Sequence, residues 1–163
     1  MVTASFLLQQ EIVGGLPADE YFLRRLVAAL PQRKWQLLEQ IGKLAASLHG
    51  AGFIHKDHYR KHIFVVERGA EWELFLIDLQ RVLGPRRHRR RWYLKDLGAL
   101  AYSAQVHTRL SLTNLIWLYR AFTGVKKLGR ADREMIAKIW QRVRTFQKRQ
   151  PKYRRVWNAP PLK

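Results

Sequence analysis

Two aspartates separated by a short β-rich stretch are the side chains of this chain best suited to catalysis. Asp57 follows His55 and Lys56 in a segment that we expect to be a loop, and Asp78 follows an apolar run at 74–77. Transfer of a phosphoryl group from a nucleotide needs two acidic roles. One carboxylate orients or deprotonates the acceptor hydroxyl, and another binds the Mg²⁺ that neutralises the phosphates. The spacing therefore predicts a phosphoryl-transfer site within residues 53–81.

Regular structure on both sides would position these two acids. Pro31 suits the first turn of a helix, because its missing N–H is not needed there, and this helix should run to about Gly50. Residues 62–67 and 72–78 are rich in β-forming side chains and are joined by a turn-like connection at 68–71. The sequence thus predicts a β-hairpin between the two aspartates, with Asp57 in the loop between the helix and the hairpin.

The remaining segments predict one domain over residues 1–157 that is α+β and mainly helical. A strand is expected at about 5–12, before Gly14-Gly15-Leu16-Pro17, and a short helix from Asp19 to about Leu30. Three C-terminal helices are expected within 92–148, the second of them capped by Ser111. The tail at 158–163 is expected to fray.

Charge is the unusual feature of the composition. Lys and Arg number 31 against 12 Asp and Glu, a formal net charge of +19, which predicts a polyanionic partner such as phospholipid headgroups, a phosphorylated substrate or nucleic acid. The absence of cysteine excludes disulfides and thiolate metal sites. Since no apolar run approaches about 18 residues and the N-terminus lacks a signal-peptide pattern, we expect a cytoplasmic protein.

The catalytic stretch resembles the kinase pattern, in which H-R-D-x-x-x-x-N supplies the base and D-F-G the metal-binding aspartate. Here the matching residues are His55-Lys56-Asp57, then His62, then Asp78-Leu79-Gln80. Three segments are similar to the lipopolysaccharide kinase family, bacterial kinases with a protein-kinase-like fold that phosphorylate heptose or Kdo sugars of the lipopolysaccharide inner core. These segments read HKDHYRKHIFV (55–65), LIDLQRV (76–82) and RRHRRRWYLKDLGALAYS (86–103), and the resemblance spans about residues 5–103.

The resemblance implies ATP and Mg²⁺ as cofactors, and it gives each matched residue a role. Asp57 would be the catalytic base and Asp78 the Mg²⁺ ligand, with His62 beside the metal and the nucleotide. His55 would brace the loop, and Lys56 would contact the transferred phosphoryl group. The other implied roles are adenine contacts from a hinge strand (Gln9, Gln10, Glu11, Ile12), a helix brace for the catalytic loop (Asp96), and binding of an anionic substrate by the basic segment 81–95 (Arg81, Arg86, Arg87, Arg89, Arg90, Arg91).

The resemblance begins at the expected hinge strand, so the chain is expected to be a carboxy-terminal lobe without the glycine-rich small lobe. Three functions stay open at this point. The first is an ATP-dependent lipopolysaccharide sugar kinase, peripheral to the inner face of a Gram-negative inner membrane. The second is an inactive kinase fragment or pseudokinase that serves as a binding module. The third is a basic nucleic-acid-binding domain, against which the core spacing of most aromatic residues argues. The sugar, the acceptor hydroxyl and the oligomeric state stay open as well.

Overall fold

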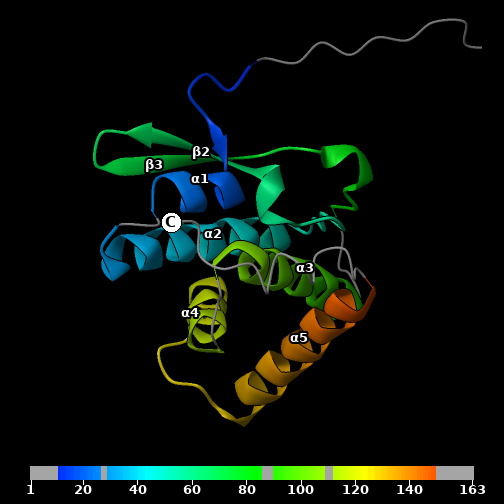
Figure 1. The fold of residues 1–163 in the computed structure, drawn as a ribbon. Helices are drawn as coiled ribbons and strands as arrows, with labels where there is room; N and C mark the ends of the chain where they lie inside the picture. The colour runs from blue at the N-terminus through cyan, green and yellow to red at the C-terminus, as the bar shows by residue number, and fades with distance from the viewer. Residues whose placement is uncertain (1–10, 27–28, 86–89, 109–111, 150–163) are drawn as a thin grey trace, which may run out of the picture.

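The computed structural model describes residues 11–26, 29–85, 90–108 and 112–149. In chain order its elements are β1 (Leu16–Pro17), α1 (Ala18–Arg24), α2 (Pro31–Gly50), the 3₁₀ helix η1 (Arg60–His62), β2 (Ile63–Arg68), β3 (Glu71–Leu76), the 3₁₀ helix η2 (Leu79–Arg81), α3 (Arg90–Thr108), α4 (Leu112–Thr123) and α5 (Arg130–Arg149). The small sheet lies above α1 and α2, and α4 and α5 lie on the far side of α2 and α3 (Figure 1). The prediction of a mainly helical α+β fold is confirmed.

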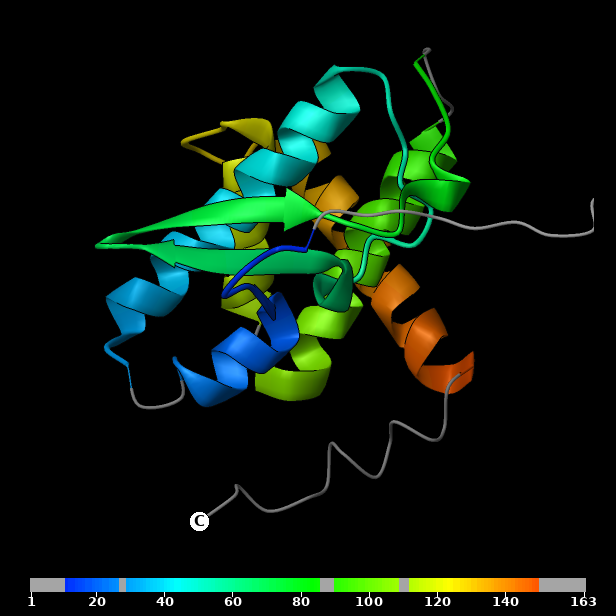
Figure 2. The same cartoon turned by 90° about the horizontal axis from the view of Figure 1, so that it is seen from above.

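The predicted hairpin is the centre of the sheet. β2 pairs antiparallel with β3 in a continuous register from Ile63–Leu76 to Arg68–Glu71, and β1 adds a short antiparallel edge on the other side of β2. Gly69 adopts a positive φ of 63° in the two-residue turn, a conformation that glycine takes without steric cost. Figure 2 shows the sheet lying over α1 and α2. The buried side chains of Ile63, Val65 and Trp72 belong to one core cluster with residues of these two helices.

The first segment of the chain differs from the prediction. Residues 5–10 of the expected hinge strand lie outside the described residues, and its last two, Glu11 and Ile12, are not in a strand. The carbonyl of Ile12 instead accepts a hydrogen bond from the N–H of Gly15 in a turn. The described strand begins at Leu16, because pairing with Val65 of β2 outweighs the local turn preference of the Gly-Gly-Leu-Pro sequence.

The helices agree closely with the sequence periodicity, with one exception. α2 begins at Pro31 and ends at Gly50, as predicted, whereas α1 ends at Arg24 instead of continuing to about Leu30. The N-cap of α1 is Pro17, so Asp19 lies in the first turn, where its negative charge complements the helix dipole. Ser111, the expected cap of α4, lies outside the described residues.

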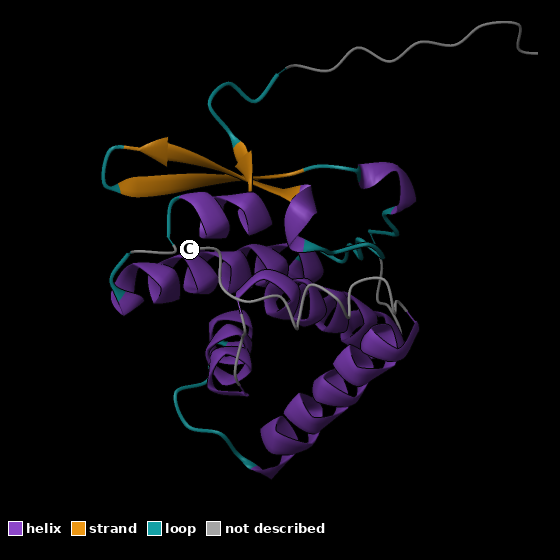
Figure 3. Ribbon diagram, in the orientation of Figure 1, coloured by secondary structure: helices purple, strands orange, loops and turns teal. Residues whose placement is uncertain are grey.

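Two loops meet at one end of the helical layer and carry the predicted site (Figure 3). One loop connects α2 to η1, and the other connects β3 to α3. Ile54 and Leu83 join the two loops in an isolated antiparallel bridge, with both N–H···O distances at 2.8 Å. Ile54 is fully buried, so the bridge is anchored in the core. The fold thus pairs the two loops that carry Asp57 and Asp78.

Candidate active site

Asp57 lies in the loop after α2, and its carboxylate is accessible. The side chain is 21% exposed, and one carboxylate oxygen accepts a hydrogen bond from Nη1 of Arg81 at 2.7 Å. Arg81 belongs to η2, which directly follows Asp78. The structure therefore brings a cation from the second loop onto the predicted base of the first loop.

Asp78 lies at the other side of the same site, and His62 joins it to Asp57. Nδ1 of His62 donates to the backbone carbonyl of Asp57 at 2.8 Å, and Nε2 of the same ring lies 3.4 Å from a carboxylate oxygen of Asp78. Because a carbonyl oxygen can only accept, Nδ1 of His62 carries a proton. The Asp78 side chain is 41% exposed, so its carboxylate is open to solvent rather than buried at a strand end.

His55 connects the two loops from inside the protein. Its ring is fully buried, and Nε2 donates to the carbonyl of Ile77 at 2.9 Å. Ile77 immediately precedes Asp78, so this hydrogen bond fixes the backbone that presents the second carboxylate. The His55 side chain therefore contacts the backbone of the second loop and is shielded from solvent.

Each loop contains one non-glycine residue in the left-handed region of the backbone. Lys56 has φ of 72° and Asp78 has φ of 59°. Such a conformation disfavours L-residues by roughly 1–2 kcal/mol and persists only where surrounding contacts enforce it. Both residues are predicted site residues, and both are adjacent to hydrogen-bonded neighbours in the two loops.

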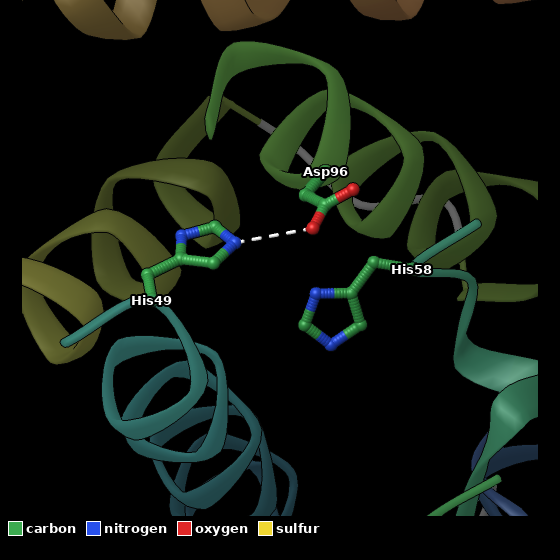
Figure 4. A group of neighbouring side chains, drawn as sticks. All are labelled: His49, His58 and Asp96. Atoms are coloured by element: carbon green, nitrogen blue, oxygen red, sulfur yellow. Dashed lines mark hydrogen bonds and ion pairs between the residues drawn. The ribbon is translucent and has the colours of Figure 1, made fainter. Parts of the chain in front are cut away.

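Asp96 of α3 supplies the contact that holds the first loop (Figure 4). Its two carboxylate oxygens accept the backbone N–H groups of His55 and Lys56, both at 2.8 Å, and Nε2 of His49 lies 3.1 Å from Oδ2. Burial raises the pKa of Asp96, but the hydrogen bond from His49, the nearby histidines and the His55 N–H outweigh burial and lower that pKa. Asp96 therefore holds Lys56 in its left-handed conformation as an ionised carboxylate.

Two further histidines, His49 and His58, lie beside Asp96 and were not predicted from the sequence. One donor atom from each of the two rings and one carboxylate oxygen of Asp96 lie within 4.8 Å of one another, and all three side chains are buried (Figure 4). Although this donor set could ligate a metal, the Oδ2 atom of Asp96 already accepts from His55 and His49. Burial lowers the pKa of His58 to about 3, so this ring is neutral. We interpret Asp96 and His49 as a hydrogen-bonded brace, with the His58 ring packed beside them.

A second set missed by the sequence analysis surrounds Trp92, in the first turns of α3. The side-chain cations of Lys56, Arg91 and Lys95 all lie within 6 Å of its ring centroid, at 5.7, 5.2 and 5.7 Å. The only sequence signal for this set is an aromatic residue between basic residues. Of the predicted anion-binding arginines, Arg81 contacts Asp57 and Arg90 begins α3, whereas Arg86, Arg87 and Arg89 lie outside the described residues.

The predicted adenine contacts are not brought to the site by the described part of the chain. Gln9 and Gln10 lie outside it, and Glu11 is exposed. A surface pocket of about 220 Å³ lies where β1, α1 and β2 meet, and its lining includes Leu16, Tyr21 and Glu67. None of the predicted catalytic residues lines this pocket.

The donor atoms between the two loops fit a bound cation. Nε2 of His62 and a carboxylate oxygen of Asp78 lie 3.4 Å apart, and two such atoms repel each other unless a proton or a cation lies between them. Asp78 offers the oxygen donors that Mg²⁺ prefers, whereas His62 offers nitrogen, a weaker choice for that ion. Asp78 and His62 are therefore the described residues that could hold the metal of a phosphoryl-transfer reaction.

The chain resembles known proteins both in sequence and in fold. The model of the lipopolysaccharide kinase (Kdo/WaaP) family matches residues 6–143. The lipopolysaccharide core heptose(I) kinase WaaP of Escherichia coli is 27% identical over 109 residues, 64% of this chain and 41% of that protein. The protein of the same name from Pseudomonas aeruginosa is 32% identical over 78 residues, 45% of this chain and 29% of that protein.

The fold is also similar to that of a solved protein. A structure described as WaaP in complex with acyl carrier protein superposes with a TM-score of 0.68 at 22% sequence identity. The superposition covers 91% of this chain and 60% of that chain. The chain thus spans less than half the length of the two curated relatives and 60% of the solved one.

Proposed function

Because this chain belongs to the lipopolysaccharide kinase (Kdo/WaaP) family, we propose that it catalyses the ATP-dependent phosphorylation of a heptose or Kdo sugar of the lipopolysaccharide inner core. The observation that carries this proposal is the position of His62 between the two acidic loops. Its ring binds the Asp57 carbonyl and faces the Asp78 carboxylate, so one side chain sets the spacing of both acids.

Asp57 is proposed to orient the acceptor hydroxyl and to accept its proton. The carboxylate is accessible, and one of its oxygens lies 2.7 Å from Nη1 of Arg81. Arg81 is itself 59% exposed, so it can also meet negative charge on a substrate while it holds Asp57.

Asp78, together with His62, is proposed to hold Mg²⁺ with the phosphates of ATP. When bound, the metal would neutralise negative charge on the phosphates during transfer. The αL conformation of Asp78 and the hydrogen bond from His55 to Ile77 define the backbone from which the Asp78 carboxylate extends. Lys56 and the arginines of the basic segment would meet the negative charge of the phosphoryl group and the acceptor.

The protein is proposed to work at the inner face of a Gram-negative inner membrane. Within the described ranges no helix is long and apolar enough to cross a bilayer. α5 presents a face of exposed basic side chains, including Arg133, Lys138 and Arg144, that complements anionic headgroups. The complex reported for the solved relative makes acyl carrier protein a second candidate partner, which co-purification of the two proteins would test.

The test is transfer of labelled phosphate from ATP to dephosphorylated lipopolysaccharide core by the purified chain. We expect Mg²⁺-dependent incorporation that falls at least about 100-fold in Asp57→Asn. The matched control is Glu73→Gln, which removes an exposed carboxylate from the neighbouring hairpin and should leave the rate unchanged. No incorporation by the wild-type chain, or equal rates for wild type and Asp57→Asn, would contradict the proposal and favour a binding module.

A further inference from the structure

Trp92 gathers three cationic side chains beside the catalytic loop. Nζ of Lys56 and Nζ of Lys95 each lie 5.7 Å from the Trp92 ring centroid, and the Arg91 guanidinium carbon lies 5.2 Å from it. Cations within about 6 Å of a tryptophan ring are attracted to its electron-rich face. The ring therefore fixes the positions of positive charges that come from two separate segments, the catalytic loop and α3.

This concentration of positive charge has little to offset it. Lys95 is within electrostatic reach of Lys56 and Arg81 as well as of two carboxylates, Asp57 and Asp96. Asp96 is buried and accepts hydrogen bonds from the loop, and Asp57 is already paired with Arg81. The first turn of α3 contains no acidic residue, and the N-terminus of a helix adds partial positive charge of its own.

The pKa of Lys95 also reflects the excess of positive charge around Trp92. Burial lowers its pKa, and the charges of Arg81 and Lys56 lower it further, although Asp57 and Asp96 act in the opposite direction. A protein surface holds several ammonium and guanidinium groups together at a free-energy cost that a bound anion removes. The site is thus organised for a negative group that arrives with a ligand.

We propose that Lys56, Arg91 and Lys95, gathered by Trp92, form a subsite for an anionic substituent that the acceptor sugar already carries. This inference rests on the proposed function, because it places the subsite beside the hydroxyl that Asp57 would orient. The substituent is a carboxylate or a phosphate on the sugar or on its neighbour. Trp92 acts as a positioning residue for the lysines, and the lysines bind the ligand.

The subsite makes a charged acceptor bind more tightly than a neutral one of the same shape. A charge-assisted hydrogen bond from a lysine is stronger than one to a neutral group, so the preference is expected to be about tenfold or more in Kd. The same cations could instead bind the phosphoryl group of the nucleotide. A test must therefore separate charge on the sugar from charge on ATP.

The sugar acid Kdo and its methyl ester are suitable probes, since they differ in one negative charge. Their Kd values for the purified chain would be measured by ligand-observed NMR titration, which needs no catalytic activity. We expect wild type to prefer the acid about tenfold, and Lys95→Gln and Trp92→Leu each to reduce this preference to about twofold or less. Lys126→Gln, which removes an exposed lysine in the loop between α4 and α5, should keep it. Melting temperatures would show that each variant is folded.

Three results would overturn the inference. The first is that wild type binds the acid and the ester with equal affinity. The second is that Lys95→Gln keeps the preference for the acid. The third is that the preference disappears when a non-hydrolysable ATP analogue and Mg²⁺ saturate the protein. The last result would assign the cations to the nucleotide. Phosphate transfer by wild type in the absence of any preference would retain the kinase and reject the subsite alone. A preference without transfer would reject the kinase and retain the subsite.

Discussion

Acidification is expected to destabilise this fold through one buried histidine, His58. Its ring is fully buried, and both ring nitrogens lack a hydrogen-bond partner among the described residues. Burial is the largest cause that lowers the pKa of His58 from 6.5 to about 3, and the neighbouring rings of His55, His49 and His62 act in the same direction. The carboxylate of Asp96 opposes the shift but does not overcome it.

The sign and size of the effect follow from this difference in pKa. Between pH 6.5 and about 3 the unfolded chain binds a proton at His58 that the folded protein does not bind, so stability falls as the pH falls. Each pH unit in that window contributes about 1.4 kcal/mol. From about pH 7.5 to about pH 4.5 the expected loss is therefore roughly 2–3 kcal/mol, a large part of the stability of a typical domain. The lowered pKa of Asp96 contributes stability that is lost only below its ordinary value of 3.8, outside this range.

Urea unfolding followed by circular dichroism at several pH values measures this loss. The informative variant is His58→Phe, which keeps an aromatic ring in the position where His58 stacks on His55 at 5.5 Å. No hydrogen bond of the His58 ring to a described residue is lost, so the variant should stay within about 1–2 kcal/mol of wild type near pH 7.5. Between about pH 7.5 and about pH 4.5 its stability should fall by roughly 2–3 kcal/mol less than that of wild type.

Parallel pH profiles for the two proteins would refute this reasoning, because they would show that His58 is not the group whose protonation is coupled to unfolding. A profile that is flat in wild type over the same range would refute it as well. The difference between the two proteins should be constant above about pH 7.5, where His58 is neutral in both states.

Four other substitutions test the packing and the loop. Gly42→Ala should destabilise the protein by about 1–3 kcal/mol, because the added Cβ would lie 2.6 Å from Cβ of Ala121. Gly50→Ala, which has open space around the added Cβ, should be neutral or stabilising. The midpoints of urea unfolding for the two variants and wild type measure this difference. Lys56→Gly should leave the stability unchanged or raise it by up to about 1 kcal/mol, because glycine accepts φ of 72°. The same variant should lower the rate of phosphate transfer. A loss of stability would contradict the strain argument. Asp96→Asn should cost about 2–4 kcal/mol, because an amide nitrogen cannot accept a backbone N–H; a change under about 0.5 kcal/mol in urea unfolding would contradict the brace.

The elements that sequence periodicity predicted well are those whose residues determine their own structure. α2 was predicted to begin at Pro31 and end at Gly50, because the proline suits a first helical turn and the apolar residues recur at helical steps. The β2–β3 hairpin was predicted from two β-rich runs and a short connection, and its Gly69 turn adopts the expected kind of conformation. In both cases local preference and tertiary packing agree.

Tertiary contacts decided the features that the sequence could not give. β1 is only two residues long and forms because Leu16 and Pro17 pair with β2. The left-handed backbone of Lys56 opposes the preference of lysine and is set by Asp96, 40 residues further along the chain. Burial of His49 and His58 around Asp96 has no sequence signal, because histidine is as common at surfaces as it is inside proteins.

The roles of the site residues depended on the family resemblance more than on spacing. Spacing alone proposed Asp57 and Asp78 as a pair, but it could not show that His62 lies between their loops. The cations around Trp92 were missed because Lys56 and Lys95 are 39 positions apart and meet only when the catalytic loop packs against α3. Their shared contact with one ring is a property of the fold.

The central claim is that Asp57 and Asp78 have different roles within one phosphoryl-transfer site. Asp57 orients the acceptor hydroxyl, and Asp78 binds the metal ion. The most direct test uses Mn²⁺ as a substitute for Mg²⁺. The affinity of the chain for Mn²⁺ in the presence of ATP would be measured by electron paramagnetic resonance. We predict that Asp78→Asn weakens Mn²⁺ binding by at least about tenfold, whereas Asp57→Asn changes it by less than about twofold. Equal loss in the two variants, or no loss in Asp78→Asn, would contradict the account.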